Sequence, residues 1–191
     1  MSDFIAWLPD ADTLDALEAL CAALPRAWPA MPPLQLRRRA QLHMTLRYLA
    51  EGLPADPTLL YAGLAELAGR TQRLPLRLDC VEAWPGAHVL VARPAPSEAL
   101  DALFAALEAV AVACGHAPES RQPRPHITLA YLPRGQSASA LATPAPGLLP
   151  LPIDACLGSL SMARTAPGRY DNLQWWPLAE PSGPGAGCTA R

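Results

Sequence analysis

The stretch RPHITLAY at residues 124–131 organises the sequence, because a second version of it, LHMTLRYL, occupies residues 42–49. Both copies contain His-x-Thr-Leu, and both continue to Tyr-Leu. A single His-x-Thr is weak evidence of a site, since short motifs arise by chance. The chain has only 4 His, however, and two of them occupy the same position of this frame. The repeat therefore indicates a paired site.

The spacing within each copy favours one shared orientation for its two polar side chains. In a β-strand alternate residues share a face, so His43 lies with Thr45 and His126 lies with Thr128. Each strand would present one imidazole and one hydroxyl in the same direction. For one isolated copy, the alternative is a polar strand face with a single buried, hydrogen-bonded histidine. The second copy favours the functional interpretation.

Composition limits the class of protein. The chain has 191 residues, of which 51% are hydrophobic and 17% charged, as expected of one globular domain or two small lobes. Its net charge of −2 and its lack of a long basic stripe exclude a protein that grips duplex nucleic acid along its length. An RNA ligand would instead be held at an end.

The sequence contains no signal for zinc binding, disulfides or a membrane. Its 5 Cys are scattered, and no CxxC pair points to zinc or redox chemistry. The start has no basic segment followed by an apolar one, so we expect no signal peptide. No apolar run approaches the roughly 20 residues of a membrane helix. We therefore expect a cytoplasmic protein with reduced cysteines.

Apolar periodicity and turn residues predict an alternation of strands and helices. In chain order we expect a strand (4–8), a helix, the first His-Thr strand, a helix (58–69), a hairpin (74–81 and 89–92), a helix (98–114), the second His-Thr strand, and a hairpin (151–162 and 170–177). The strands are too short and too polar for a buried parallel sheet.

The predicted fold is therefore α+β. We expect a bilobal domain over residues 1–178, with two mostly antiparallel sheets meeting at a central cleft and helices outside. Residues 133–150 are a long connection rich in Pro, Ala, Gly and Ser, which we expect to be mobile. Residues 179–191 are expected to form a disordered tail.

The paired residues suit acid–base chemistry. Two imidazoles on opposite sides of a reacting phosphorus remove and deliver protons near neutral pH. Threonine hydroxyls donate hydrogen bonds to oxygens that carry charge in the transition state. Aromatic candidates for stacking a nucleobase are Tyr48, Tyr131, Tyr170 and the pair Trp175-Trp176, although core packing is the alternative for the two tryptophans. The basic run at residues 37–39 fits a solvated strand entry better than a phosphate-facing edge.

With these residues in place, the chain resembles the two-histidine phosphoesterases, and within them the LigT-like RNA 2′,3′-cyclic phosphodiesterases, also called 2′-5′ RNA ligases. Beyond the two His-x-Thr motifs, the resemblance rests on the apolar strand at 4–8, Leu-Arg-Tyr-Leu at 46–49, Arg-Pro-His at 124–126 and Gly-Arg-Tyr at 168–170. It extends over approximately residues 2–178.

The resemblance implies a bilobal fold and an activity. The reaction opens a terminal 2′,3′-cyclic phosphate with water and leaves a 2′-phosphate, without a metal or other cofactor. His43 would be the general acid and His126 the general base, with Thr45 and Thr128 on the non-bridging oxygens. The sequence itself does not decide which histidine is the acid and which is the base, because the two motifs are nearly identical. The expected partners of the monomer are RNA 3′ ends or small cyclic nucleotides.

One departure concerns substrate binding. Members of the family often carry Arg where this chain has Tyr131, and Arg47, Arg121 and Arg124 are candidates to replace that phosphate-side cation. Three other functions share the same residues: a 2′-5′ RNA ligase, in which a 5′-hydroxyl replaces water, a phosphodiesterase acting on 2′-5′ oligonucleotides, and a binding module that holds a nucleotide or RNA end without turnover.

Overall fold

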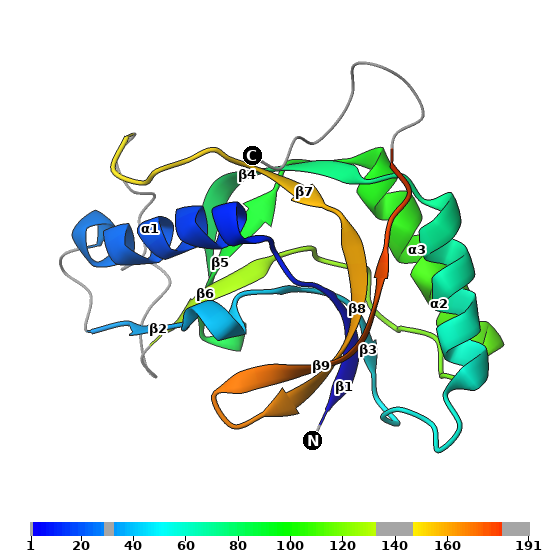
Figure 1. The fold of residues 1–191 in the computed structure, drawn as a ribbon. Helices are drawn as coiled ribbons and strands as arrows, with labels where there is room; N and C mark the ends of the chain where they lie inside the picture. Colours follow the sequence, from blue (N-terminus) through cyan, green and yellow to red (C-terminus); the bar gives the residue numbers. More distant parts are fainter. Residues whose placement is uncertain (1, 29–32, 133–146, 181–191) are drawn as a thin grey trace.

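The structure is a computed structural model that describes residues 2–28, 33–132 and 147–180 (Figure 1). These residues form three α-helices, nine strands and two short 3₁₀ helices. In chain order they are β1 (Asp3–Trp7), α1 (Ala11–Ala27), β2 (Gln35–Leu36), η1 (Arg39–Gln41), β3 (Met44–Leu49), α2 (Thr58–Arg70), β4 (Leu74–Trp84), η2 (Pro85–Ala87), β5 (Val89–Pro94), α3 (Glu98–Ala113), β6 (Ile127–Tyr131), β7 (Ile153–Leu157), β8 (Ser159–Ala166) and β9 (Arg169–Pro177).

Side-chain caps start two of the helices. The Asp10 carboxylate accepts the Thr13 N–H at 2.9 Å at the start of α1, and the Ser97 hydroxyl accepts the Leu100 N–H at 3.3 Å at the start of α3. Such bonds satisfy N–H groups that have no partner within the helix. After α3 the chain turns at Gly115, whose φ of +91° is one that glycine adopts without strain.

The strands form one curled sheet in the order β7-β4-β5-β6-β3-β1-β8-β9, with β2 added beside β6. Every pair of these strands is antiparallel, which confirms the α+β class. We expected two sheets, and the structure joins the two four-stranded halves through a single pair, Met44 with Ile127, between β3 and β6. We call this pair the seam. Beyond it β3 and β6 diverge, so the two halves form one hydrogen-bonded sheet but their strands run in different directions.

The helices cover one face of this sheet. Helix α1 packs against β6 and β7, whereas α2 and α3 pack against each other and against β3, β8 and β9 (Figure 1). Ile5 and Trp7 belong to the main apolar core on this side, which runs through both halves of the sheet. Phe4 and Ala6 point the other way and pack with Ala163. We call the face that carries Phe4 and Ala6 the site face, and the opposite one the helix face.

A β-bulge interrupts the first motif strand. Along the β1–β3 pairing, Ala6 lies opposite Thr45 and Ile5 lies opposite Arg47, which leaves Leu46 as an extra residue. Because successive strand residues point to opposite faces, one extra residue reverses the orientation of the side chains that follow it. Thr45 therefore shares the site face with Ala6, and Arg47 shares the helix face with Ile5.

The second motif strand has a bulge at the equivalent position. Along the β5–β6 pairing, Val91 lies opposite Thr128 and Leu90 lies opposite Ala130, so Leu129 is the extra residue. Leu46 and Leu129 each directly follow the threonine of their motif. The two copies thus resemble each other in backbone shape as well as in sequence.

The last strands differ from the prediction. The expected strand over residues 151–162 is two strands, because β7 ends at Leu157 beside β4 and β8 begins at Ser159 beside β1. Gly158 between them carries the chain from one half of the sheet to the other.

The expected tail begins with two ordered residues. The Arg73 N–H donates to the Ala179 carbonyl at 3.0 Å, and Glu180 forms an ion pair with the Arg73 side chain. Residues 181–191 and most of the 133–150 connection lie outside the described part of the chain. Within that part, no helix has the length and apolar character needed to cross a bilayer.

Candidate active site

The two motif histidines are held by the same backbone hydrogen bond. Each lies directly before its strand, and its Nδ1 contacts the carbonyl oxygen two residues earlier: His43 with Gln41 at 3.0 Å and His126 with Arg124 at 2.7 Å. A carbonyl oxygen only accepts, so Nδ1 carries the hydrogen in both rings. In the neutral imidazole this leaves the lone pair on Nε2, the nitrogen that can accept a proton.

The motif threonines lie on the site face, as the spacing predicts. The Thr45 hydroxyl is 3.2 Å from the Nε2 of His43, within hydrogen-bond distance. Thr128 lies opposite Val91 on the β5–β6 ladder. The Met44–Ile127 seam brings the two strands together directly beside the histidines.

Aromatic rings pack against both imidazoles. The ring centroid of His43 is 5.2 Å from that of Phe4 and 4.3 Å from that of Tyr170. The ring of Trp84, at the end of β4, lies 4.5 Å from His126. These rings limit how far each imidazole can turn, and they remove part of its hydration.

Desolvation keeps both histidines neutral in the ligand-free protein. The pKa of His43 is lowered from 6.5 to about 4, chiefly by burial, with smaller contributions from the charge of Arg37 and from His126 when that ring is protonated, against the hydrogen bond to Gln41. Burial also lowers the pKa of His126, together with the charges of Arg124 and Arg93. Both rings are therefore proton acceptors near pH 7, and a bound anion would raise their pKa values.

Two arginines with no carboxylate partner among the described residues lie beside these rings. Arg37 donates to the hydroxyls of Tyr170 at 2.6 Å and Tyr131 at 3.3 Å. The guanidinium of Arg124 stacks on the ring of Trp84, 4.0 Å from its centroid. Each histidine thus has a cation and an aromatic ring close by.

The ring of Trp84 is itself fixed by polar contacts. Its indole N–H donates to Glu82 at 2.9 Å, and Arg93 donates to the same carboxylate at 2.9 Å. The Glu82 carboxylate, which carries the negative charge beside Trp84, is therefore already paired with Arg93.

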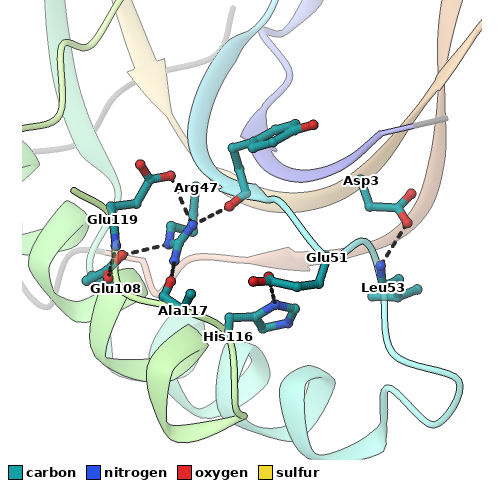
Figure 2. Close-up of polar contacts among 9 residues, drawn as sticks. Asp3, Arg47, Glu51, Leu53, Glu108, His116, Ala117 and Glu119 are labelled. Atoms are coloured by element: carbon teal, nitrogen blue, oxygen red, sulfur yellow. Dashed lines mark hydrogen bonds and ion pairs between the residues drawn. The ribbon is translucent and has the colours of Figure 1, made fainter. Parts of the chain in front are cut away.

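Arg47, a sequence candidate for phosphate binding, does not join the group. The bulge at Leu46 turns its side chain to the helix face, where it is only 6% exposed. It forms ion pairs with Glu108 at 2.6 Å and Glu119 at 2.9 Å, and donates to the carbonyls of Ala117 and Tyr48 (Figure 2). Its donors are thus occupied by α3, by the segment after α3 and by a carbonyl of β3.

Arg121, another candidate cation, is exposed in the loop before β6, and the aromatic candidates fall into three groups. Tyr131 and Tyr170 lie at the site, where their hydroxyls accept hydrogen bonds from Arg37. Tyr48 is on the site face, opposite Phe4, but its hydroxyl donates to Ser2 at 3.3 Å. Trp176 is buried in the core, as the packing alternative expected, whereas Trp175 is 57% exposed.

Sequence reasoning missed three contributors: Arg37, Phe4 and Trp84. The basic run before the first motif is the signal for Arg37, and the solvated strand entry that it predicts is wrong for this residue, which lies at the site. That interpretation holds for Arg39, which pairs with Asp15 and Glu18 on α1. No local pattern marks Phe4 or Trp84, which reach the histidines only through strand pairing.

The duplicated histidine–threonine strands on one curled antiparallel sheet define the two-histidine phosphoesterase class. A family model of the 2′-5′ RNA ligase superfamily matches residues 54–165, and the chain belongs to this superfamily. The matched range contains the second motif, while the first lies upstream of it. No curated protein matches the sequence.

Solved structures share the fold. TT0787 of Thermus thermophilus is 21% identical with a TM-score of 0.71, covering 94% of this chain and 99% of its own. E. coli LigT complexed with 3′-AMP is 22% identical with a TM-score of 0.68, covering 94% and 98%. Kluyveromyces marxianus Usb1 is 14% identical with a TM-score of 0.53, covering 93% and 97%. E. coli LigT has also been solved with ATP and with NADP+.

Proposed function

We propose that this protein hydrolyses 2′,3′-cyclic phosphate ends of RNA or of nucleotides to 2′-phosphates. The observation that carries the proposal is the matched pair of imidazoles, each with Nδ1 on a backbone carbonyl, which leaves Nε2 as the unprotonated nitrogen of the neutral ring. Membership of the 2′-5′ RNA ligase superfamily supports a phosphoesterase or ligase activity for the same residues.

The proposed reaction needs one base and one acid. The base takes a proton from water as the water oxygen attacks phosphorus, and the bond from phosphorus to the ribose 3′ oxygen breaks. The acid donates a proton to that departing oxygen, so the product carries a 2′-phosphate and a 3′-hydroxyl. Thr45 and Thr128 donate hydrogen bonds to the non-bridging oxygens. Each positioned acid or base typically contributes about 10² to 10⁴ in rate.

The family resemblance assigns His43 as acid and His126 as base. Burial lowers the pKa values of both histidines, that of His43 to about 4, so neither ring holds a second proton near pH 7. His43 therefore acts as the acid only if the bound phosphate raises its pKa. A substrate with a 3′ leaving group that needs no protonation tests this, since it restores turnover to a variant lacking the acid but not to one lacking the base.

The proposal also covers the active unit of the protein, its oligomeric state, its location and its need for a cofactor. Residues 1–178 would act as one unit, as a monomer in the cytoplasm, without a metal or other cofactor. In the described part of the chain, no three His, Cys, Asp or Glu side chains gather in a geometry that suits a metal ion. Size-exclusion chromatography checks the monomer, and chelator treatment before the assay checks the metal.

The deciding experiment uses EDTA-treated protein and a short RNA ending in a 2′,3′-cyclic phosphate. We expect a 2′-phosphate product, and turnover reduced by at least about 10² in His43→Ala and His126→Ala. His88→Asn is the matched control, because His88 is exposed in a turn at φ +53°, a conformation that asparagine tolerates. Unchanged turnover in either motif variant would overturn the two-histidine mechanism.

The same assay separates the other functions. A 2′-5′ linked product with an added 5′-hydroxyl RNA would indicate a ligase, and cleavage only of 2′-5′ linked oligonucleotides would indicate the related phosphodiesterase. Binding of the cyclic-phosphate RNA without any product would indicate a binding module.

A further inference from the structure

Arg37 lies between the two motifs because strand β2 brings it there. On the β2–β6 ladder Gln35 pairs with Tyr131, and Leu36 pairs with Ala130. The Arg37 N–H then donates to the carbonyl of Leu129 at 2.8 Å. Arg37 is thus fixed by its backbone to the strand of the second motif, although it precedes the first motif by only a few residues.

The side chain of Arg37 is held by groups that leave its charge uncompensated. Its guanidinium donates to the hydroxyls of Tyr131 and Tyr170, and its carbon lies 5.2 Å from the ring centroid of Tyr131 and 5.9 Å from that of Tyr170. These phenols orient the guanidinium, but they carry no negative charge. In the described ranges no carboxylate forms an ion pair with Arg37, in contrast to Arg39 two residues later.

Two further observations place this charge at the site. Tyr170 contacts both Arg37 and the ring of His43, so one side chain links the cation to the candidate acid–base group. The guanidinium of Arg37 is also half-buried, with no carboxylate paired to it in the described part of the chain. A half-buried cation of this kind is stabilised by an anion that binds against its accessible donors.

From this geometry we propose that Arg37 binds the phosphate of the substrate, with Tyr131 and Tyr170 holding its guanidinium in place. The proposal rests on the proposed function for the identity of the anion, a phosphate ester at an RNA or nucleotide end. Arg37 would then be a binding residue outside both motifs. It belongs to the segment before the first motif, and its backbone is paired with β6, the strand of the second motif.

Binding of inorganic phosphate, measured by titration calorimetry at pH 7 and low salt, tests the proposal without requiring turnover. We expect Arg37→Ala to weaken phosphate binding about tenfold or more, as is typical of the loss of a hydrogen bond to a charged group. Arg37→Lys keeps the charge but loses the forked guanidinium that donates to both phenols. Its affinity for phosphate should therefore lie between that of the wild type and that of Arg37→Ala.

The matched control is Arg70→Ala, which removes the same charge from an exposed site on α2, on the helix face. It should bind phosphate as the wild type does. A second test is the double variant Arg37→Ala with Tyr131→Arg. Because the Arg37 Nη1 lies 3.3 Å from the Tyr131 hydroxyl, an arginine at 131 reaches the same place and should restore part of the affinity.

The outcomes separate this proposal from the proposed function. Wild-type protein that does not bind phosphate, an Arg37→Ala variant that binds it equally well, or an equal loss in Arg70→Ala would overturn the role of Arg37. Loss of phosphate binding in Arg37→Ala, combined with no turnover of the cyclic-phosphate RNA, would leave the binding role intact and overturn the activity. Unchanged unfolding of Arg37→Ala in urea checks that the fold is retained.

Discussion

Met44 and Ile127 pair across the seam between β3 and β6, and each directly follows the histidine of its motif. Both side chains are fully buried on the helix face. Equivalent residues of the two copies therefore meet each other, and the two motifs are related by an approximate local two-fold axis. Packing under this pair governs how His43 and His126 lie relative to one another.

Shortening Ile127 should affect both stability and activity. Ile127→Ala leaves a cavity under the seam and should lower the free energy of unfolding by about 2–5 kcal/mol, against about 0.5–1.5 kcal/mol for Ile127→Val. Urea denaturation measures both. We expect turnover to fall in the alanine variant, where the seam relaxes into the cavity, and to persist in the valine variant. Equal stability of the two variants would show that the seam does not depend on this packing.

The low pKa of His43 makes stability depend on pH. Burial holds the folded-state pKa at about 4, whereas the unfolded imidazole titrates near 6.5. Between these values the unfolded chain binds a proton that the folded protein does not, so the free energy of unfolding falls as pH falls from 6.5 to 4. The His43 contribution is on the order of 3 kcal/mol at full extent, and it is constant above pH 6.5.

Denaturation curves of wild type and His43→Gln across this window isolate that contribution. The variant should lose less stability than the wild type as the pH falls, because it has no imidazole at this position. Parallel curves for wild type and His43→Gln would contradict the buried, neutral histidine.

Arg47 should matter for stability and not for phosphate binding. Arg47→Met leaves Glu108 and Glu119 without their cation and should lower the free energy of unfolding by about 2 kcal/mol, since both carboxylates retain partial access to water. A second substitution, Glu108→Gln, should recover part of the loss because the two sites interact directly.

Phosphate titration of Arg47→Met supplies the contrast with Arg37→Ala. Arg47 faces away from the histidines, so we expect its variant to bind phosphate with wild-type affinity. A loss comparable to that of Arg37→Ala would mean that Arg47 reaches the ligand after all.

Removing Arg124 should raise the pKa of His126. Burial is the main cause of the lowered pKa, and the charge of Arg124 is a further one that Arg124→Ala removes, while the backbone carbonyl that holds Nδ1 remains. NMR titration of the imidazole resonances measures the shift. Any change at His43 should be indirect, because Arg124 is not among the causes of its lowered pKa whereas His126 is. A downward shift of His126 would contradict the placement of the Arg124 charge.

The sequence predicted the parts of the site that depend on local pattern. The repeat identified both histidines and both threonines, and the strand period gave each pair its common face. Apolar periodicity likewise located the three helices, each of which packs an apolar stripe.

What the sequence did not reveal depends on strand pairing. Strict alternation would place Arg47 on the face of Thr45, and the bulge at Leu46 reverses it. A bulge of this kind leaves no mark in the composition of Leu-Arg or Leu-Ala. Strand β2 has only two residues, too few for any periodicity, so the position of Arg37 beside Tyr131 follows only from the ladder that β2 forms with β6.

The divergence of β3 from β6 has a consequence for self-association. Beyond the Met44–Ile127 pair, β6 would have an unpaired edge, and exposed strand edges are templates for pairing with another chain. Strand β2 occupies that edge at Ala130 and Tyr131, and the backbone of Arg37 extends the cover to Leu129. The segment that carries the cation thus also protects the opened sheet from edge-to-edge aggregation.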